Sequence, residues 1–200
     1  MSACSAASRV TLGCQTGCRP SLSAQRGAQA DIDAISVRPR AGNHFFADDA
    51  NVPSLLSLPF LGYVAADDPV YVATRALLLS NETNPYFYGA SGLDAVPLGG
   101  IGSEDASGNP GLGRVWPLSL AVRLLTVGDG GGRHGADAEV LATLGALRES
   151  SGGTGLMHES YWYEDSSVYT RYWFAMGSSM FAEAVLRVAE ERPWLLFADA

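Results

Sequence analysis

The residues best suited to chemistry gather in residues 153–163, which read Gly-Thr-Gly-Leu-Met-His-Glu-Ser-Tyr-Trp-Tyr. Two glycines allow the backbone to approach a ligand closely. An imidazole, a carboxylate and a hydroxyl then precede three consecutive aromatic residues. Sugar sites combine aromatic rings, which stack on C–H faces, with carboxylates, which accept hydrogen bonds from hydroxyls. The segment therefore predicts a carbohydrate site around His158 and Glu159, although any one of these residues taken alone is more often an ordinary surface side chain.

A second polar cluster comes early in the chain, where Asp48, Asp49 and Asn51 stand within four positions. Capping of a following helix explains one aspartate but not both together with Asn51. Glycoside hydrolysis uses two carboxylates, one on each side of the scissile bond. We expect helix pairing to bring Asp48 or Asp49 toward Glu159, at a separation that the sequence does not give.

Other catalytic chemistries find little support. The three histidines, His44, His134 and His158, are widely spaced, whereas a zinc site needs three or four ligands at close spacing. No Gly-x-Ser-x-Gly motif is present for a serine nucleophile. We therefore expect neither a metal nor a cofactor.

The charge balance is acidic, with 21 Asp and Glu against 13 basic residues, a net charge of −8 and a pI near 4.7. This balance disfavours a nucleic-acid partner. No apolar run is long enough to predict a membrane span, and no secretory signal is evident, so the compartment stays open. All three cysteines lie in the first 18 residues, which excludes a disulfide framework for the rest of the chain.

Residues 1–41 form a low-complexity segment, whose first 40 residues contain no Trp, Tyr or Phe. Such a composition cannot bury enough apolar surface to order itself, so we expect disorder. Three arginines and no acidic residue in the first 30 positions resemble an organelle transit peptide. The competing interpretation is that this segment is not native upstream sequence.

The rest of the chain predicts helices in antiparallel pairs, with few strands. The expected helices are residues 52–66, 69–80, 116–127, 137–149 and 170–191. Residues 81–114, 129–135 and 152–163 are expected to be loops, and Val140, Leu141, Leu144 and Leu147 are expected to share one apolar face. The long connection after residue 80 contains polar and aromatic residues, which indicates a binding loop.

Five blocks in one order resemble the metal-independent exo-α-1,6-mannosidases of glycoside hydrolase family 125. They are DDANVPSLLSLPFLGY (48–63), DPVYVATRALLLSNETNPYFYG (68–89), GIG with WPLSL (100–102 and 116–120), GTGLMHES (153–160) and TRYWFAMGSSMFAEAVL (170–186). The resemblance implies that residues 42–200 are the C-terminal part of an all-α (α/α)6 toroid. It also implies hydrolysis with inversion, with no metal or cofactor.

The resemblance further implies roles for single residues. Glu159 is the expected general base, and a mannose pocket is expected to be lined by Asp48, Asp49, Asn51, Trp116, His158 and Arg171. The implied substrate is an α-mannoside or an oligosaccharide derived from an N-glycan. Two alternatives stay open: another toroid glycosidase, such as a glucoamylase-like enzyme, or a remnant that binds glycans without cleaving them.

Two departures from the family pattern affect these expectations. The usual Gly-Ile-Gly-x-Pro-His is here Gly-Ile-Gly-Ser-Glu-Asp, at residues 100–105. The family's general acid belongs to an upstream Arg-Pro-Ser-Asp-Asp block that this sequence lacks. We therefore expect a truncated form that is poorly soluble and nearly inactive alone, because loss of the acid costs about 10²–10⁴-fold in rate.

Overall fold

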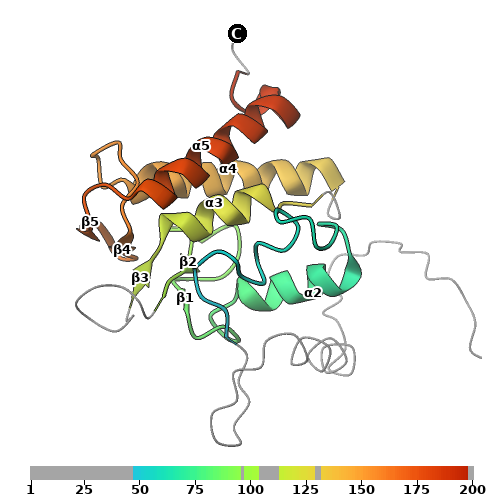
Figure 1. Cartoon of the computed structure of the whole chain (residues 1–200), viewed down its shortest axis with the longest axis horizontal. Helices are drawn as coiled ribbons and strands as arrows, with labels where there is room; N and C mark the ends of the chain where they lie inside the picture. The colour runs from blue at the N-terminus through green and yellow to red at the C-terminus, as the bar shows by residue number, and fades with distance from the viewer. Residues whose placement is uncertain (1–46, 96, 104–112, 129–131, 198–200) are drawn as a thin grey trace, which may run out of the picture.

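The computed structural model describes residues 47–95, 97–103, 113–128 and 132–197, so the expectation for residues 1–41 lies outside the described part. Within those ranges the chain forms four α-helices, a 3-10 turn and two small sheets (Figure 1). The helices are α2 (Pro69–Leu78), α3 (Pro117–Leu125), α4 (Gly132–Ser150) and α5 (Ala175–Glu191), followed by η2 (Pro193–Leu195). None of the described helices combines the length and apolar character that a bilayer span requires.

Helix α3 is the centre of the fold, and all nine of its residues are buried. It packs against both α4 and α5, while α2 and the small strands lie on its other side (Figure 1). Leu118 and Val122 of α3 join one apolar cluster, whereas Leu120 and Leu124 join a second one. A helix with apolar residues all round is expected to be enclosed on every side, as α3 is.

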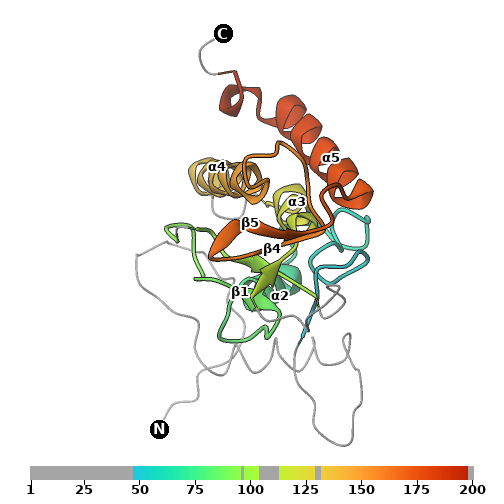
Figure 2. The ribbon, with the colours of Figure 1, turned by 90° about the vertical axis from the view of Figure 1, so that its left-hand side faces the viewer.

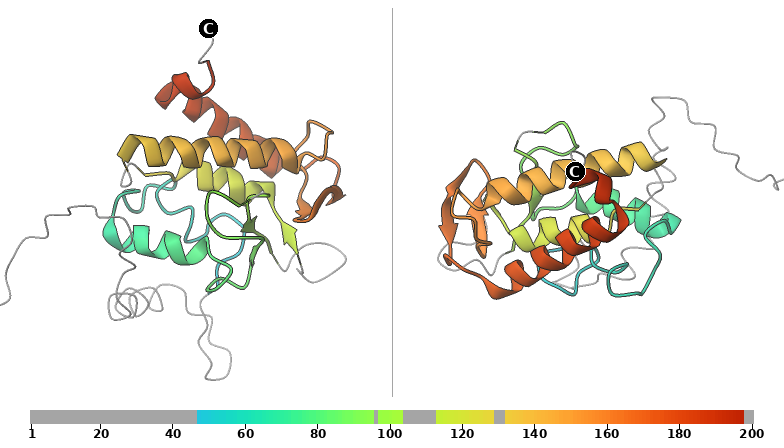
Figure 3. Two further views of the ribbon diagram at one scale, coloured as in Figure 1. Left: turned by 180° about the vertical axis from the view of Figure 1, so that it is seen from behind. Right: turned by 90° about the horizontal axis from the view of Figure 1, so that it is seen from above.

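The strands form two antiparallel sheets. In the first, β1 (Phe87–Tyr88) pairs with β2 (Gly100–Ile101). In the second, β4 (Ser160–Trp162) lies between β3 (Arg114–Val115) and β5 (Asp165–Thr170). The β4–β5 hairpin covers one end of α3 and α4 (Figures 2 and 3).

Two expected helices agree closely with the structure. Helix α2 begins at Pro69, where the Asp68 carboxylate accepts hydrogen bonds from the amides of Val70 and Tyr71. Such a cap satisfies amides that have no partner within the helix. Helix α3 falls inside the segment expected at residues 116–127.

Helix α4 begins at Gly132, so the predicted break over residues 129–135 is wrong from residue 132 onward. Contacts from the C-terminal segment hold this first part: Asp137 pairs with Arg192 at 2.7 Å, and Arg133 lies over the ring of Trp194. The expected apolar face is also partly wrong. Val140 and Leu147 are buried, but Leu141 is half exposed.

The prediction of a helix over residues 52–66 is wrong, because this segment is a series of turns. The amides of Leu55 and Leu56 donate to the Asp48 carboxylate, which turns the backbone away from a helical ladder. Pro59 also lacks the amide hydrogen that a helix interior needs. These local side-chain bonds compete successfully with helix formation.

The expected helix over residues 170–191 begins only at Ala175, because residues 165–170 form β5. The backbone of this segment forms hydrogen bonds with β4 and therefore cannot be helical. The expected loop over residues 152–163 is also partly wrong, because residues near its end belong to β4. The expected loop over residues 81–114 contains β1 and β2. The regular structure of the described part is therefore mostly helical, but this part is not all-α.

Candidate active site

Glu159 lies directly before β4 and is 4% exposed. Its backbone amide donates to the carbonyl of Thr170 at the end of β5, 3.2 Å away. Its carboxylate has two neighbours from the same strand end: the Thr170 hydroxyl donates to Oε2 at 3.1 Å, and Arg171 Nε lies 3.1 Å from Oε1. The hairpin therefore fixes both the backbone and the carboxylate of the expected base.

A second hydroxyl extends this arrangement inward. Ser160 Oγ lies 2.7 Å from Thr170 Oγ1, and Ser160 is fully buried. Because Thr170 gives its hydrogen to Glu159, Ser160 must donate to Thr170. The resulting order, Ser160 to Thr170 to Glu159, is a directed hydrogen-bond chain that ends on the carboxylate.

Arg171 connects the buried carboxylate to the surface. Its side chain is 59% exposed, whereas that of Glu159 is 5% exposed. Its φ of 43° places a non-glycine residue in the left-handed region, which is uncommon. The guanidinium also lies 5.9 Å from the centre of the Phe174 ring. Arg171 thus pairs with the buried Glu159 carboxylate on one side and is exposed to solvent on the other.

His158 is fully buried, with its ring stacked on Tyr169 at 3.7 Å. Nδ1 lies 2.8 Å from the carbonyl of Tyr172, and Nε2 lies 3.1 Å from the carbonyl of Ser151. The ring therefore ties the segment before β4 to the segment after β5. His158 has no exposed surface, so in this structure it holds the loop of Glu159 in place. The expectation that His158 lines an open pocket therefore differs from what the structure shows.

The two aspartates of the early cluster have different tasks. The Asp48 carboxylate accepts from the amides of Leu55 and Leu56, both at 3.2 Å. Burial raises the pKa of Asp48 to about 6, against the lowering effect of these two amides. Its backbone is held by Asn84, whose side chain donates to the Asp48 carbonyl at 2.9 Å. Asp48 therefore shapes the turn.

Asp49, in contrast, belongs to a polar group with Asn51 and Ser103. Its carboxylate accepts from the Asn51 side chain at 3.0 Å and from the Ser103 hydroxyl at 3.0 Å. All of Ser103 is buried, while Asp49 and Asn51 keep part of their surface. Ser103 is the residue at the variable position of the Gly-Ile-Gly-Ser motif. The departures at Glu104 and Asp105 lie outside the described residues.

Trp116 directly precedes α3. It is 3% exposed, belongs to the apolar cluster that contains Ala50 and Leu56, and meets Phe174 edge-on at 5.8 Å. Its indole Nε1 is buried with no hydrogen-bond partner among the described residues. Phe174 in turn lies 5.9 Å from the Arg171 guanidinium, so Trp116 and Arg171 share a neighbour.

Sequence reasoning missed three residues of the candidate site: Thr170, Ser160 and Ser103. Thr170 and Ser160 both fall inside the quoted family blocks, but the segment around Thr170 was expected to be helical. A strand over residues 165–170 would have put Thr170 opposite Ser160, as the register shows. Residues 168–170, Val-Tyr-Thr, are residue types that favour strands and were the available sequence signal.

The described residues contain no group of three or more His, Cys, Asp or Glu side chains that could hold a metal ion. The geometry offers a buried carboxylate with fixed orientation, a cation at its exposed edge, and a separate polar group around Asp49. Such an arrangement suits proton transfer by a carboxylate base.

The chain is similar to known proteins over most of its length. Residues 35–186 match the family described as metal-independent alpha-mannosidase (GH125). The chain is 45% identical over 159 residues to the meiotically up-regulated gene 157 protein of Schizosaccharomyces pombe, covering 80% of this chain and 28% of that protein. It also matches the structure of a metal-independent α-mannosidase from Streptococcus pneumoniae, in a non-productive complex with α-1,6-mannobiose.

The match to the streptococcal structure has a TM-score of 0.60 and 39% identity, and it covers 76% of this chain. The chain spans about a third of the length of that solved structure, at 32%, and 28% of the yeast relative.

Proposed function

Because the chain belongs to the metal-independent α-mannosidase family GH125, we propose that it carries the catalytic base of an inverting exo-α-1,6-mannosidase, and that this base is Glu159. The observation that carries the proposal is the buried Glu159 carboxylate, which is held by Thr170 and Arg171 at the edge of the surface. The streptococcal relative, bound to α-1,6-mannobiose and described in the context of N-linked glycan processing, supports an α-mannoside as substrate.

In this mechanism Glu159 accepts a proton from a water molecule while the water oxygen attacks the anomeric carbon. The bond to the leaving oxygen breaks at the same time, and a second carboxylic acid protonates that oxygen. Arg171 and Thr170 hold the two carboxylate oxygens of Glu159, so the base keeps one orientation. Such positioning of a proton acceptor contributes to rate because the water must be held in line for attack.

We assign roles to the remaining site residues by whether their side chains have accessible surface. We assign sugar hydroxyl contacts to Asp49 and Asn51, whose side chains keep accessible surface. We assign Asp48 and His158 to positioning, because each is held by backbone groups. The indole N–H of Trp116 is the donor in the region that still lacks a partner among the described residues. The toroid is part of the proposal, supported by the packing of α3 against both α4 and α5.

The sharpest test uses α-mannosyl fluoride, because fluoride leaves without protonation and the assay then depends on the base alone. Wild-type chain should release fluoride and give β-mannose as the first product. Glu159→Gln keeps the size of the side chain and should reduce the rate by about 10²–10⁴-fold, the usual contribution of a general base. The control is Glu183→Gln, an exposed acid on α5, which should keep the wild-type rate.

Three further measurements test the absence of a metal, the preference for mannose and the stereochemistry of the product. Addition of EDTA should leave the rate unchanged, since the proposed mechanism uses no metal. α-Glucosyl fluoride should react far more slowly, which separates a mannosidase from a glucoamylase-like enzyme. If Glu159→Gln kept the wild-type rate, or if the first product were α-mannose, the assignment of an inverting base at Glu159 would be wrong.

A further inference from the structure

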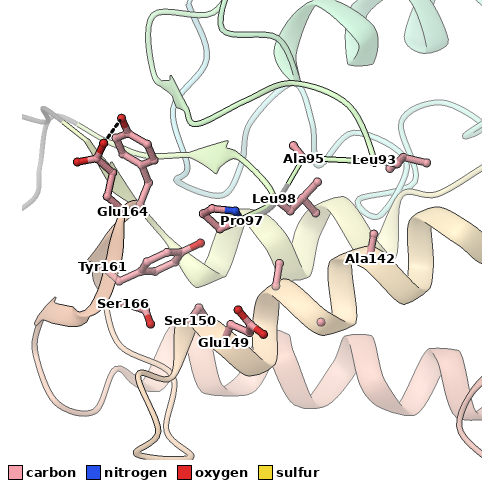
Figure 4. A pocket seen from close by; sticks show the side chains of 13 residues that line it. Leu93, Ala95, Pro97, Leu98, Ala142, Glu149, Ser150, Tyr161, Glu164 and Ser166 are labelled. Carbon is pink, nitrogen blue, oxygen red and sulfur yellow. Dashed lines mark hydrogen bonds between the residues drawn. The ribbon is translucent and has the colours of Figure 1, made fainter.

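A cavity of about 430 Å³ lies outside the region of Glu159 (Figure 4). Three parts of the chain form its wall: the segment before β2, the second half of α4, and the β4–β5 hairpin. None of the residues assigned above to the candidate active site lines it. Its volume falls in the range of small-molecule sites, which is about 300–1,000 Å³.

Tyr161 of β4 is the polar group that points to a ligand. The residue is 5% exposed, and no hydrogen-bond partner for its hydroxyl is found among the described residues. Figure 4 shows its side chain extending from β4 toward Pro97 and α4. Burial raises the pKa of Tyr161, so the group stays a neutral hydroxyl. The Tyr161 hydroxyl is not among the fully enclosed atoms that lack a partner, so it keeps accessible surface in the cavity, where a ligand can hydrogen-bond to it.

The charge of the lining excludes one class of ligand. Glu149 and Glu164 contribute carboxylates, whereas no Lys, Arg or His is among the lining residues. An anion would meet repulsion without compensation. The hydroxyl of Tyr163 is already used, because it donates to Glu164 at 3.1 Å.

The remaining surface suits a sugar ring. Tyr161 and Tyr163 offer aromatic surface, and Ala142, Gly145 and Ala146 form a floor of small side chains along α4. Carboxylates and hydroxyls at the edges can bind sugar hydroxyls, while the rings and the small residues accept the C–H faces. We propose that this cavity is a second carbohydrate site, which binds a neutral mono- or disaccharide through the Tyr161 hydroxyl, at a distance from the catalytic base.

The chain offers a matched pair of blocking and control variants on one helix. A Cβ added at Gly145, in the cavity wall, meets no atom within 4 Å, and the same holds for Gly135 near the start of α4, away from the cavity. Gly145→Leu should therefore fill the cavity without disturbing the fold, and Gly135→Leu should leave the cavity open. Replacing helical glycine also favours the folded state, which guards against loss of structure.

The experiment titrates the chain with methyl α-mannoside and with α-1,6-mannobiose, and follows the backbone amide NMR signals of Ala142 and Ala146. Saturable shifts are expected in the wild type, in Gly135→Leu and in Glu159→Gln. Gly145→Leu should abolish them, and Tyr161→Phe should weaken binding by about fivefold, the loss expected for one neutral hydrogen bond.

The two proposed sites fail separately in this design. Shifts at Ala142 and Ala146 that survive in Gly145→Leu, or their absence at 50-fold excess of either sugar over protein on the order of 100 μM, would overturn the second site. Fluoride release by Gly145→Leu should equal that of the wild type, since the variant leaves Glu159 unchanged. Loss of fluoride release in Gly145→Leu would contradict the independence of the two sites.

Discussion

Thr170 donates its hydroxyl to Oε2 of Glu159 at 3.1 Å, from the opposite strand of the β4–β5 hairpin. The same hydroxyl lies 2.7 Å from Ser160 Oγ, which is fully buried and belongs to the strand that begins after Glu159. One threonine therefore uses both its donor and an acceptor position to join the two strands and to orient the carboxylate. The hairpin is the structural reason that Glu159 has one defined orientation.

Thr170→Val should lower the turnover of α-mannosyl fluoride by about tenfold or more, because a hydrogen bond to a charged group contributes about 1.5–3 kcal/mol. The Michaelis constant should change little, since Thr170 orients the base and does not touch the sugar. Thr170→Ser keeps the hydroxyl and should recover most of the rate. Equal loss in both variants would show that the methyl group, and not the hydrogen bond, matters.

Asp48 should make the stability of the fold depend on pH. Its pKa is raised from 3.8 to about 6, mainly by burial, with a smaller contribution from the neighbouring Asp49. Between these values the folded chain holds a proton that the unfolded chain has lost, so the free energy of unfolding falls as pH rises. The shift of about two units corresponds to roughly 3 kcal/mol.

Asp48→Asn removes this titration. Urea unfolding of both proteins should be measured from pH 4 to pH 7, and the difference between their free energies of unfolding should change across that window. Above pH 6 the difference should be constant. A difference that does not vary between pH 4 and pH 6 would contradict the raised pKa. The comparison of variants cancels the contributions of other carboxylates, such as Glu139.

The sequence predicted those elements that are determined by residues within or next to them. Asp68 and Pro69 mark the start of α2, and the uninterrupted apolar residues after Trp116 mark α3. It failed where a distant partner decides the local conformation. Residues 165–170 form a strand because β4 is available beside them, and residues 55 and 56 leave the helical ladder because Asp48 accepts their amides.

The site shows the same division. Residue type and order predict Glu159 and Asp49 as site residues, the family resemblance adds Arg171, and the structure pairs Arg171 with Glu159. Exposure was not predictable in this way. Tyr169 and the Tyr172 carbonyl enclose His158 from the other side of the hairpin, and the Ser151 carbonyl encloses it from the segment before β4. Thr170 acts through a partner 11 positions away, and only the strand-forming residues around it indicate its place. Ser103 acts through a partner 54 positions away, so no local pattern identifies it.

Glu139 neutralises two arginines and should be important for stability. Its carboxylate lies 2.9 Å from Arg75 Nη2 and 2.9 Å from Arg123 Nε, and Arg123 is buried. Burial alone would raise the pKa of Glu139, but the two cations lower it overall. Glu139→Gln should cost about 3–5 kcal/mol, because it leaves buried positive charge unpaired. Urea unfolding measures this loss, and exposed Glu190→Gln should lie within about 0.5 kcal/mol of the wild type.

The contribution of Glu139 and its two arginines to stability has its own pH dependence, opposite in sign to that of Asp48. A carboxylate whose pKa is depressed in the folded chain stabilises the fold above its unfolded value, near 4.5, and this contribution is lost as pH falls through the lower folded value. Glu139→Gln should therefore lie closest to the wild type in acid. A stability difference that grew toward low pH would contradict the ion pair.

Gly102→Ala should damage the candidate site through the backbone. An added Cβ would collide with the carbonyl oxygen of Arg114 and lie 2.8 Å from Tyr88 Cε2. The Gly102 carbonyl accepts from the amide of Ala50 at 2.9 Å, and the next residue, Ser103, donates to Asp49. The methyl group should thus separate β2 from β3 and release Asp49, at a cost of about 1–3 kcal/mol.

Two comparisons make the origin of that cost clear. Gly135→Ala adds a methyl group in open space on α4, and should raise stability by about 0.5–1 kcal/mol. Ser103→Ala removes only the hydroxyl that bridges Asp49 and Asn51, so it should weaken mannoside binding while keeping most of the stability that Gly102→Ala loses. Thermal unfolding and sugar titration of the three variants separate backbone collision from loss of the bridge. If Gly102→Ala were as stable as the wild type, the close approach of β2 to the Arg114 carbonyl would be wrong.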